Sequence, residues 1–248
     1  MKKHIIIISV LCVIALAVGY WSSLEKQGVA SRGDANSIEE KEPDFLQEGL
    51  VAYYPFNGNV KDESGNGYDG KVNGAGVIVD GKAKFNGVDQ YVVAECQSLP
   101  QGKASRTLSF WAQAERHKAL TENIVSWGEF SKGKSFGAYV GKNKFAFLGV
   151  GSPGADFWVG PSDADMHHHC INYDGKKMVT YYIDGQEKAS VYREQLNTSG
   201  KTVFMGAQVN LAEDRFFKGS IDDVRIYNRA LSKEQVKALY EWEKPKAE

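Results

Sequence analysis

Short runs of hydrophobic residues, separated by glycine-containing turns, follow one another along the chain after residue 48. They are rich in Val, Tyr, Phe and Ile, which favour β-strands, and they include residues 91–94, 108–112, 145–150 and 178–183. Pairs such as Asn86-Gly87 and Asp184-Gly185 stand between the runs and tolerate the positive φ of tight hairpins. Many short strands with few helices predict an all-β fold, a two-sheet antiparallel β-sandwich or a jelly roll.

One further strand is predicted at residues 220–227, which are rich in β-branched and aromatic residues and contain no Pro or Gly. Alternation along a strand places Asp222 on the same face as Val224 and Ile226. On this more apolar face a carboxylate must be paired, accept hydrogen bonds or bind a cation. Asp222 is therefore expected to have a partner.

A short C-terminal helix is predicted directly after this strand. Ser232 and Gln235 have the spacing of a capping box, and Leu231 with Val236 has the spacing of a hydrophobic staple. Val236 and Leu239 begin an apolar stripe along the helix. Because such a short helix is marginal by itself, we expect it to pack on the sheet.

The first 21 residues form a targeting segment. Lys2 and Lys3 precede an apolar run from residue 5 to residue 18 that contains no charged residue. Its length lies between that of a signal-peptide core and that of a membrane-spanning helix, so a cleaved signal peptide and an uncleaved membrane anchor both stay open. In either case the remainder is predicted outside the cytoplasm: secreted, periplasmic or anchored at the cell surface, with membrane contact only through this segment.

Residues 22–48 are predicted to be a flexible linker, because Ser, Glu, Lys, Asp and Gly dominate there. About 200 residues remain from 49 to 248, an ordinary size for one all-β domain. The net charge is −1, and no cluster of Lys and Arg with interleaved aromatic residues occurs in the sequence. These features argue against nucleic acid as a partner.

Four segments carry the pattern of a known domain family, in the order that the family has them. They are Gly49-Leu-Val-Ala-Tyr-Tyr-Pro-Phe-Asn-Gly58 with the loop at 62–67, residues 83–91, residues 167–175 with 181–185, and Gly219-Ser-Ile-Asp-Asp-Val-Arg-Ile-Tyr-Asn-Arg-Ala-Leu-Ser232. Together, over residues 49–240, they resemble the laminin G-like (pentraxin-like jelly-roll) domains of the concanavalin A-like lectin/glucanase superfamily. The resemblance implies a concanavalin A-like jelly roll that acts as a noncatalytic binding module for a carbohydrate or, as in related domains, for a cell-surface protein.

The resemblance also implies a structural Ca²⁺, which in the superfamily joins the N-terminal segment to an Asp of the final strand. Asp222 is the matching position, and Asp62 and Asn66 offer the oxygen ligands that calcium prefers on a nearby loop. The alternative is that Asp62 caps a turn and that Asp222 accepts backbone hydrogen bonds.

Four aromatic residues are candidates for stacking on a sugar. Trp111 shares its predicted strand face with hydrogen-bonding residues, and Trp127, Phe157 and Trp158 lie in or near predicted loops. The alternative for each ring is packing in the core, where large aromatic residues of a sandwich are usually found.

Two further groups of residues have reactive side chains. Cys96 and Cys170 form either a disulfide in an oxidising compartment or two buried thiols, and their spacing does not decide between these. The consecutive histidines 167–169 suggest a metal, but no partner at a recognised spacing accompanies them, so we interpret them as structural.

Catalytic motifs do not occur in the sequence. No strand-like segment has the Glu-x-Asp-x-Glu pattern of the hydrolases in this superfamily, and neither Gly-x-Ser-x-Gly nor His-Glu-x-x-His is present. We therefore expect a binding module and no enzyme. The alternatives to carbohydrate binding are a protein–protein interaction or adhesion domain at the cell surface and, third, a cryptic glycoside hydrolase.

Overall fold

A computed structural model gives the fold of the chain. It describes residues 41–75, 77–115, 121–141, 144–149, 157–161, 165–194, 196–213 and 215–245, with the backbone alone at 157, 158 and 161. The predicted leader, residues 1–21, and residues 22–40 of the predicted linker lie outside the described residues. Among the residues that the structure describes, no helix is long and apolar enough to cross a membrane.

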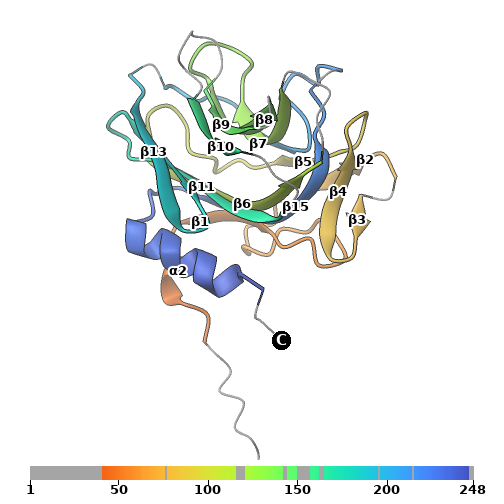
Figure 1. Cartoon of the computed structure of the whole chain (residues 1–248), viewed down its shortest axis with the longest axis horizontal. Helices are drawn as coiled ribbons and strands as arrows, with labels where there is room; N and C mark the ends of the chain where they lie inside the picture. Colours follow the sequence, from red (N-terminus) through yellow and green to blue (C-terminus); the bar gives the residue numbers. More distant parts are fainter. Residues whose placement is uncertain are drawn as a thin grey trace, which may run out of the picture. The chain divides into compact units, whose positions relative to one another are not determined.

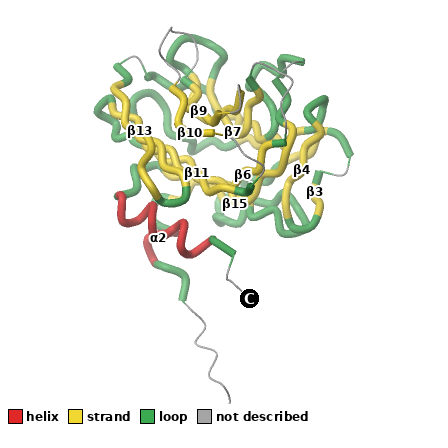
Figure 2. Tube along the Cα trace, viewed as in Figure 1, coloured by secondary structure: helices red, strands yellow, loops and turns green. Residues whose placement is uncertain are grey.

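The described residues form two antiparallel sheets (Figures 1 and 2). The eight-stranded sheet contains β1 (Leu50–Tyr54), β3 (Ile78–Val79), β4 (Lys82–Asn86), β6 (Arg106–Ala114), β11 (His167–Tyr173), β12 (Met178–Ile183), β13 (Gln186–Tyr192) and β15 (Lys218–Tyr227). The seven-stranded sheet contains β2 (Lys71–Asn73), β5 (Tyr91–Glu95), β7 (Glu122–Gly128), β8 (Ser135–Gly141), β9 (Lys144–Leu148), β10 (Phe157–Pro161) and β14 (Thr202–Met205). Their spatial orders are β13-β12-β11-β6-β15-β4-β3, with β1 also paired to β15, and β10-β9-β8-β7-β14-β5-β2.

The inward faces of the two sheets meet in one hydrophobic core. Leu108, Phe110 and Ile171 enter it from the eight-stranded sheet, and Trp127 and Val203 enter it from the seven-stranded sheet. All five side chains are fully buried. The predicted all-β, two-sheet sandwich is therefore confirmed.

The hairpin turns follow the predicted chemistry. Asp184 and Gly185, between β12 and β13, have φ values of 50° and 70°, and Asp80 and Gly81, between β3 and β4, have φ values of 50° and 71°. Two consecutive positive φ angles are what a tight hairpin with right-handed strand twist requires. These Asp-Gly pairs therefore set the register of their hairpins.

A bulge in β15 decides which of its side chains face the core. The register with β6 shifts just after Asp222, and Asp223 has a φ of 45°. The extra residue allows Ile221 and Val224, three positions apart, to enter the core together. Asp222 consequently lies on the opposite face, and the prediction that it shares the face of Val224 and Ile226 is wrong.

The predicted C-terminal helix is α2 (Lys233–Glu243), which lies along the outer face of the eight-stranded sheet (Figure 1). Its capping box is present, with the Ser232 hydroxyl accepting from the Gln235 backbone N–H. Val236 and Leu239 are fully buried in a second hydrophobic cluster, together with tyrosines of β12 and β15. The helix thus closes this face of the sandwich.

The chain enters the domain beside this helix. A short 3₁₀ helix, η1 (Asp44–Leu46), ends in a leucine that is fully buried in the same cluster. Arg229 donates to the carbonyl oxygens of Phe45, at 2.8 Å, and Glu48, at 2.7 Å. The compact unit accordingly begins at Glu42, ahead of the expected start of the domain, and the last residues of the predicted linker belong to the fold.

Both cysteines of the domain are free and buried. Cys96 lies in the core between the sheets, whereas Cys170 lies in the cluster beneath α2. The eight-stranded sheet stands between these two clusters, so the disulfide that the sequence leaves open is not formed.

A buried guanidinium closes one end of the sandwich. Arg106 is fully buried and donates to the carbonyl oxygens of Ala104, Pro100 and Gly102, at 2.9, 3.0 and 2.7 Å. Burial lowers the pKa of Arg106 to about 10, so the group stays charged at neutral pH. One side chain thus satisfies three carbonyl groups of the connection before β6.

We expect Arg106→Lys to lower the free energy of unfolding by about 2–4 kcal/mol, because an ammonium group does not reach all three carbonyls and leaves buried acceptors unpaired. Urea unfolding followed by tryptophan fluorescence measures the change. Arg193→Lys, at a half-buried position on the loop after β13, is the control and should change stability by less than about 0.5 kcal/mol. Equal effects of the two substitutions would contradict the assigned role of Arg106.

Candidate functional site

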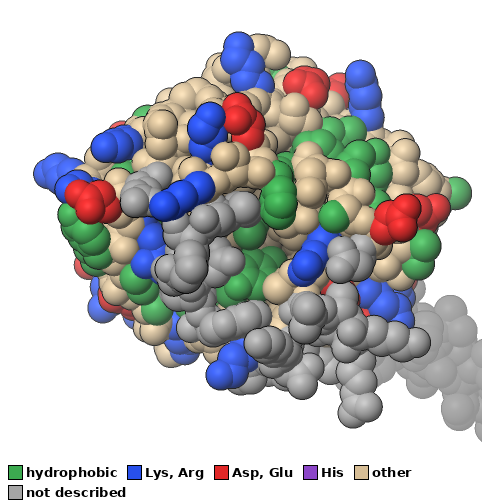
Figure 3. Space-filling view, turned by 90° about the horizontal axis from the view of Figure 1, so that it is seen from above, with side chains coloured by type: hydrophobic (Ala, Val, Ile, Leu, Met, Phe, Trp, Pro, Cys, Tyr) green, Lys and Arg blue, Asp and Glu red, His purple; other side chains and the backbone are tan. Residues whose placement is uncertain are grey.

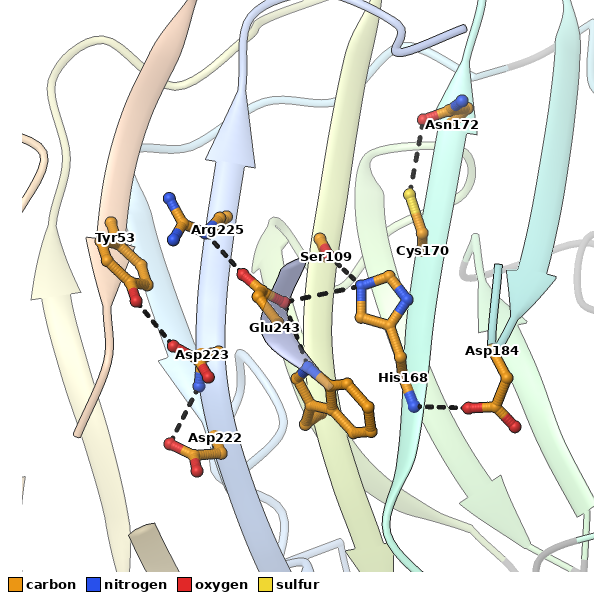
Figure 4. A network of polar contacts seen from close by, with 11 residues as sticks. Tyr53, Ser109, His168, Cys170, Asn172, Asp184, Asp222, Asp223, Arg225 and Glu243 are labelled. Carbon is orange, nitrogen blue, oxygen red and sulfur yellow. Dashed lines mark hydrogen bonds and ion pairs between the residues drawn. The ribbon is translucent and has the colours of Figure 1, made fainter. Parts of the chain in front are cut away.

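The outer face of the eight-stranded sheet holds a buried polar network beneath α2 (Figure 4). Glu243, the last residue of α2, has a side chain that is only 3 % exposed. Its Oε1 accepts a hydrogen bond from Arg225 Nε at 2.7 Å, and its Oε2 accepts one from Trp111 Nε1 at 3.1 Å. The Tyr53 ring covers the guanidinium, and the ring centroid lies 3.6 Å from Arg225 Cζ. The C-terminal end of α2 is thereby bound to β6 and β15.

Arg225 keeps its charge in this setting. Burial acts to lower its pKa, but the neighbouring Glu243 carboxylate acts in the opposite direction, and the pKa of Arg225 lies above its ordinary value. A buried ion pair of this kind adds little net stability compared with apolar residues, but the loss of one partner leaves a costly unpaired charge. The pair therefore makes attachment of α2 strongly dependent on both residues.

Ser109, His168 and Glu243 match a hydrolytic triad in residue type, but their geometry does not fit one. Ser109 Oγ and Glu243 Oε2 lie 2.8 and 3.8 Å from the same ring nitrogen, His168 Nε2. A triad places the acid on the nitrogen opposite the nucleophile, and in the described part of the chain His168 Nδ1 has no hydrogen-bond partner. The serine and the histidine are also fully buried. We assign a structural role to this network.

The three consecutive histidines have structural surroundings. Burial lowers the pKa of His168 to about 3 and that of His169, which stacks on Phe110 with ring centroids 5.1 Å apart, well below its ordinary value. His167 Nδ1 lies 2.7 Å from Asp184 Oδ2. Across the described ranges, no group of three or more His, Cys, Asp or Glu residues could hold a metal ion.

The predicted calcium ligands make local hydrogen bonds. The carboxylate oxygens of Asp62 accept backbone N–H groups of β1 and of its own loop at 2.9–3.0 Å, and Asn66 donates to carbonyl oxygens of β1. Asp222 accepts from the Asp223 backbone N–H, and burial, with the Asp223 charge, raises the pKa of Asp222 to about 7. These contacts agree with the capped-turn alternative, and calcium at this place stays a prediction.

Two of the four predicted sugar-stacking residues are in the wrong place for that role. Trp127 is fully buried in the core, and Trp111 is 7 % exposed, with its ring 5.8 Å from that of Tyr240 on α2. Neither ring face is open to a ligand, so both predictions are wrong. Phe157 and Trp158 lie in β10, and their side chains lie outside the described part of the chain.

Three other aromatic rings meet on the outer side of the seven-stranded sheet, and we call them the aromatic cluster. The Tyr91 ring centroid lies 6.1 Å from that of Phe204 and 6.1 Å from that of Phe216. Tyr91 and Phe204 alternate with core residues of β5 and β14 and are half-buried, so part of their ring surface meets solvent. Hydrophobic side chains gather on this side of the molecule (Figure 3).

Hydrogen-bonding side chains adjoin the aromatic cluster. Thr202 Oγ1 donates to Glu95 Oε1 at 2.9 Å on neighbouring strands of the same sheet. Ser126 is the cross-strand partner of Phe204, and Asn123 forms a bridge with the third residue of the cluster, Phe216. Open ring surface beside polar groups suits a ligand that offers both C–H and hydroxyl groups.

Sequence reasoning missed the aromatic cluster, because Tyr91 precedes the other two members by more than 100 residues. One local signal was present. Alternation within residues 91–95 already places Tyr91 and Val93 opposite Val92 and Ala94. Only the pairing of β5 with β14 brings Phe204 next to that face.

Comparison with known families agrees with the fold. Residues 86–237, more than half of the chain, match the family model described as the concanavalin A-like lectin/glucanases superfamily. A separate comparison of the chain with curated proteins gives no match.

Solved structures with a similar fold include three binding domains of botulinum neurotoxins. The receptor binding domain of the C/D mosaic serotype has a TM-score of 0.65 at 15 % identity, over 80 % of this chain and 52 % of that chain. The binding domain of neurotoxin DC in complex with rat synaptotagmin II has a TM-score of 0.64 at 14 % identity, over 79 % and 52 %. The serotype D domain in complex with N-acetylneuraminic acid has a TM-score of 0.63 at 15 % identity, over 80 % and 52 %. This chain thus spans about half the length of those chains, and likeness at this identity establishes the fold.

We expect Glu243→Ala to lower the free energy of unfolding by about 3–5 kcal/mol, because it leaves the Arg225 charge buried without its partner. Glu241→Ala, two residues earlier on the exposed side of α2, is the matched control and should cost less than about 1 kcal/mol. Urea unfolding of both variants measures the difference. A small effect of Glu243→Ala would show that the network does not hold the helix.

The buried neutral histidines predict that stability falls in acid. In the unfolded chain each histidine takes up a proton near pH 6.5, whereas in the folded chain the buried histidines stay neutral. Their contribution to the free energy of unfolding is therefore fully present above pH 6.5 and is lost as the pH falls below it. Between pH 7 and pH 5, the free energy of unfolding of the wild type should fall by about 2 kcal/mol more than that of His169→Phe. Groups that titrate in both proteins, such as Asp222, cancel in this difference. Urea titrations at the two pH values measure it, and equal losses would contradict the burial of a neutral His169.

Proposed function

Because the chain belongs to the concanavalin A-like lectin/glucanase superfamily, we propose that it is a noncatalytic binding module whose ligand is a carbohydrate. The aromatic cluster is the observation that carries this proposal. Tyr91 and Phe204 offer partly open ring faces to the C–H groups of a sugar, and hydrogen-bonding side chains lie beside them. The cluster lies largely on strands, which hold its rings in place more firmly than loops would.

The similar structures support a binding role without deciding the ligand. One neurotoxin domain was solved in complex with N-acetylneuraminic acid and another with rat synaptotagmin II. A sugar and a protein are therefore both ligands of this fold elsewhere. A protein partner at the cell surface is the rival proposal for this chain.

The surroundings of the acidic groups support a noncatalytic role. Glycoside hydrolysis uses two carboxyl groups placed across the bond that breaks. Glu95, the carboxylate described beside the aromatic cluster, accepts a hydrogen bond from Thr202, and Glu243 is buried beneath α2. Neither arrangement resembles an acid and a base that face a common substrate.

We also propose that the module acts outside the cytoplasm, with residues 1–21 as a cleaved signal peptide or a membrane anchor. Residues 42–48 join the domain on the side of the eight-stranded sheet, where Arg229 holds them. The aromatic cluster lies on the outer side of the other sheet. Attachment through the N-terminus would therefore leave the cluster unobstructed.

A glycan array probed with residues 42–248 should show specific binding, and Tyr91→Ala should weaken it at least about tenfold by removing ring surface. Tyr192→Ala is the matched control, because Tyr192 is 54 % exposed on the eight-stranded sheet and should leave binding unchanged. Repeating the array with chelator tests the predicted Ca²⁺ at Asp62, Asn66 and Asp222. If the folded wild-type domain binds no glycan, carbohydrate binding is refuted and the protein partner becomes the better proposal.

A further inference from the structure

Two buried oxygen atoms beside the aromatic cluster have no hydrogen-bond partner within the described part of the chain: Asn123 Oδ1 and Ser126 Oγ. The two residues are 1 % and 0 % exposed. Buried polar atoms are nearly always paired, because an unpaired one carries the full cost of its lost hydration. Two such atoms three residues apart on β7 call for an explanation by function.

Both residues adjoin the cluster through strand pairing. Ser126 pairs with Phe204 across β7 and β14, and Asn123 forms a bridge with Phe216. Side chains directly opposite each other on one face of an antiparallel pair, as Ser126 and Phe204 are, have Cβ atoms about 4.5–5.5 Å apart, which is contact distance. Ser126 therefore adjoins the half-buried ring of Phe204, and Asn123 adjoins Phe216, the buried ring of the cluster.

We propose that Asn123 and Ser126 form the hydrogen-bonding part of the carbohydrate site, whose apolar part is the aromatic cluster. In this site Asn123 Oδ1 accepts a hydrogen bond from a sugar hydroxyl, and Ser126 Oγ exchanges one with a second hydroxyl. The rings take the C–H face of the same sugar. This inference rests on the proposed function and names the residues that distinguish a sugar from a purely apolar ligand.

Both oxygens are enclosed in the ligand-free domain, so the sugar reaches them only when a neighbouring side chain turns aside. Phe204 is half-buried and lies directly beside Ser126, so its ring is the side chain whose rotation would expose Ser126 Oγ. The unpaired oxygens favour such an opening, because the ligand supplies the hydrogen bonds that the closed form lacks.

Ser135 provides a matched control on the same sheet. It is fully buried like Ser126, but its Oγ donates to the Glu129 carbonyl oxygen at 2.6 Å. Replacement by alanine therefore removes a made hydrogen bond at Ser135 and an unmade one at Ser126. Ser135→Ala should therefore lower stability and leave binding unchanged, whereas Ser126→Ala should keep stability and weaken binding.

The experiment measures Tm and glycan-array binding for Ser126→Ala, Asn123→Ala, Ser135→Ala and Tyr91→Ala. We expect Ser126→Ala to keep or raise Tm and to weaken glycan binding about tenfold, and Asn123→Ala to weaken it similarly. Ser135→Ala should lower Tm by about 2–4 °C and leave binding unchanged.

Three results would overturn the inference. If Tyr91→Ala abolishes glycan binding while Ser126→Ala and Asn123→Ala retain it, the proposed function stands and this assignment falls. If Ser126→Ala lowers Tm as Ser135→Ala does and leaves binding intact, the hydroxyl is structural, paired with an enclosed water. If the folded wild-type domain binds no glycan on the array, the proposed function and the inference fail together.

Discussion

The buried ion pair between Arg225 and Glu243 is the contact on which the closed side of the domain depends. It joins the last residue of α2 to β15 of the larger sheet. Trp111 donates to the same carboxylate, and Tyr53 covers the guanidinium. Because two buried charges are tolerable only while they stay together, α2 is bound to one position on the sheet. The tyrosines and leucines under the helix are thereby kept from water.

The two sheets consequently present outer faces of different character. The outer face of the eight-stranded sheet is covered by α2 and by residues 42–48, and Arg225, Glu243, Trp111 and Arg229 hold those segments in place. The outer face of the seven-stranded sheet keeps half-buried aromatic rings on β5 and β14 and unpaired oxygens on β7. A jelly roll has no need of such features for its own stability, since its core lies between the sheets. Binding is the role that we propose for them.

The local patterns of the sequence predicted the strands, the turns and the C-terminal helix correctly. The capping box at Ser232, the Asp184-Gly185 turn and the alternation of short strands all depend on neighbours in sequence, and the structure has each of them. The face of Asp222 was mispredicted because the bulge at Asp223 adds a residue that no periodic rule anticipates. Trp111 and Trp127 were mispredicted as ligand contacts because alternation tells which residues share a face but not what covers that face.

The sequence by itself determined the sandwich, its final strand and helix, and its likeness to a family of jelly-roll domains, because hydrophobic period, turn chemistry and caps act over a few residues. Tertiary structure alone decided which side chains on each outer face are covered and which keep part of their surface exposed. Trp111 is covered only because α2 folds back over β6, and Tyr91 meets Phe204 only because β5 pairs with β14. Exposure and proximity are set by long-range pairing, and long-range pairing is what assembles the candidate site.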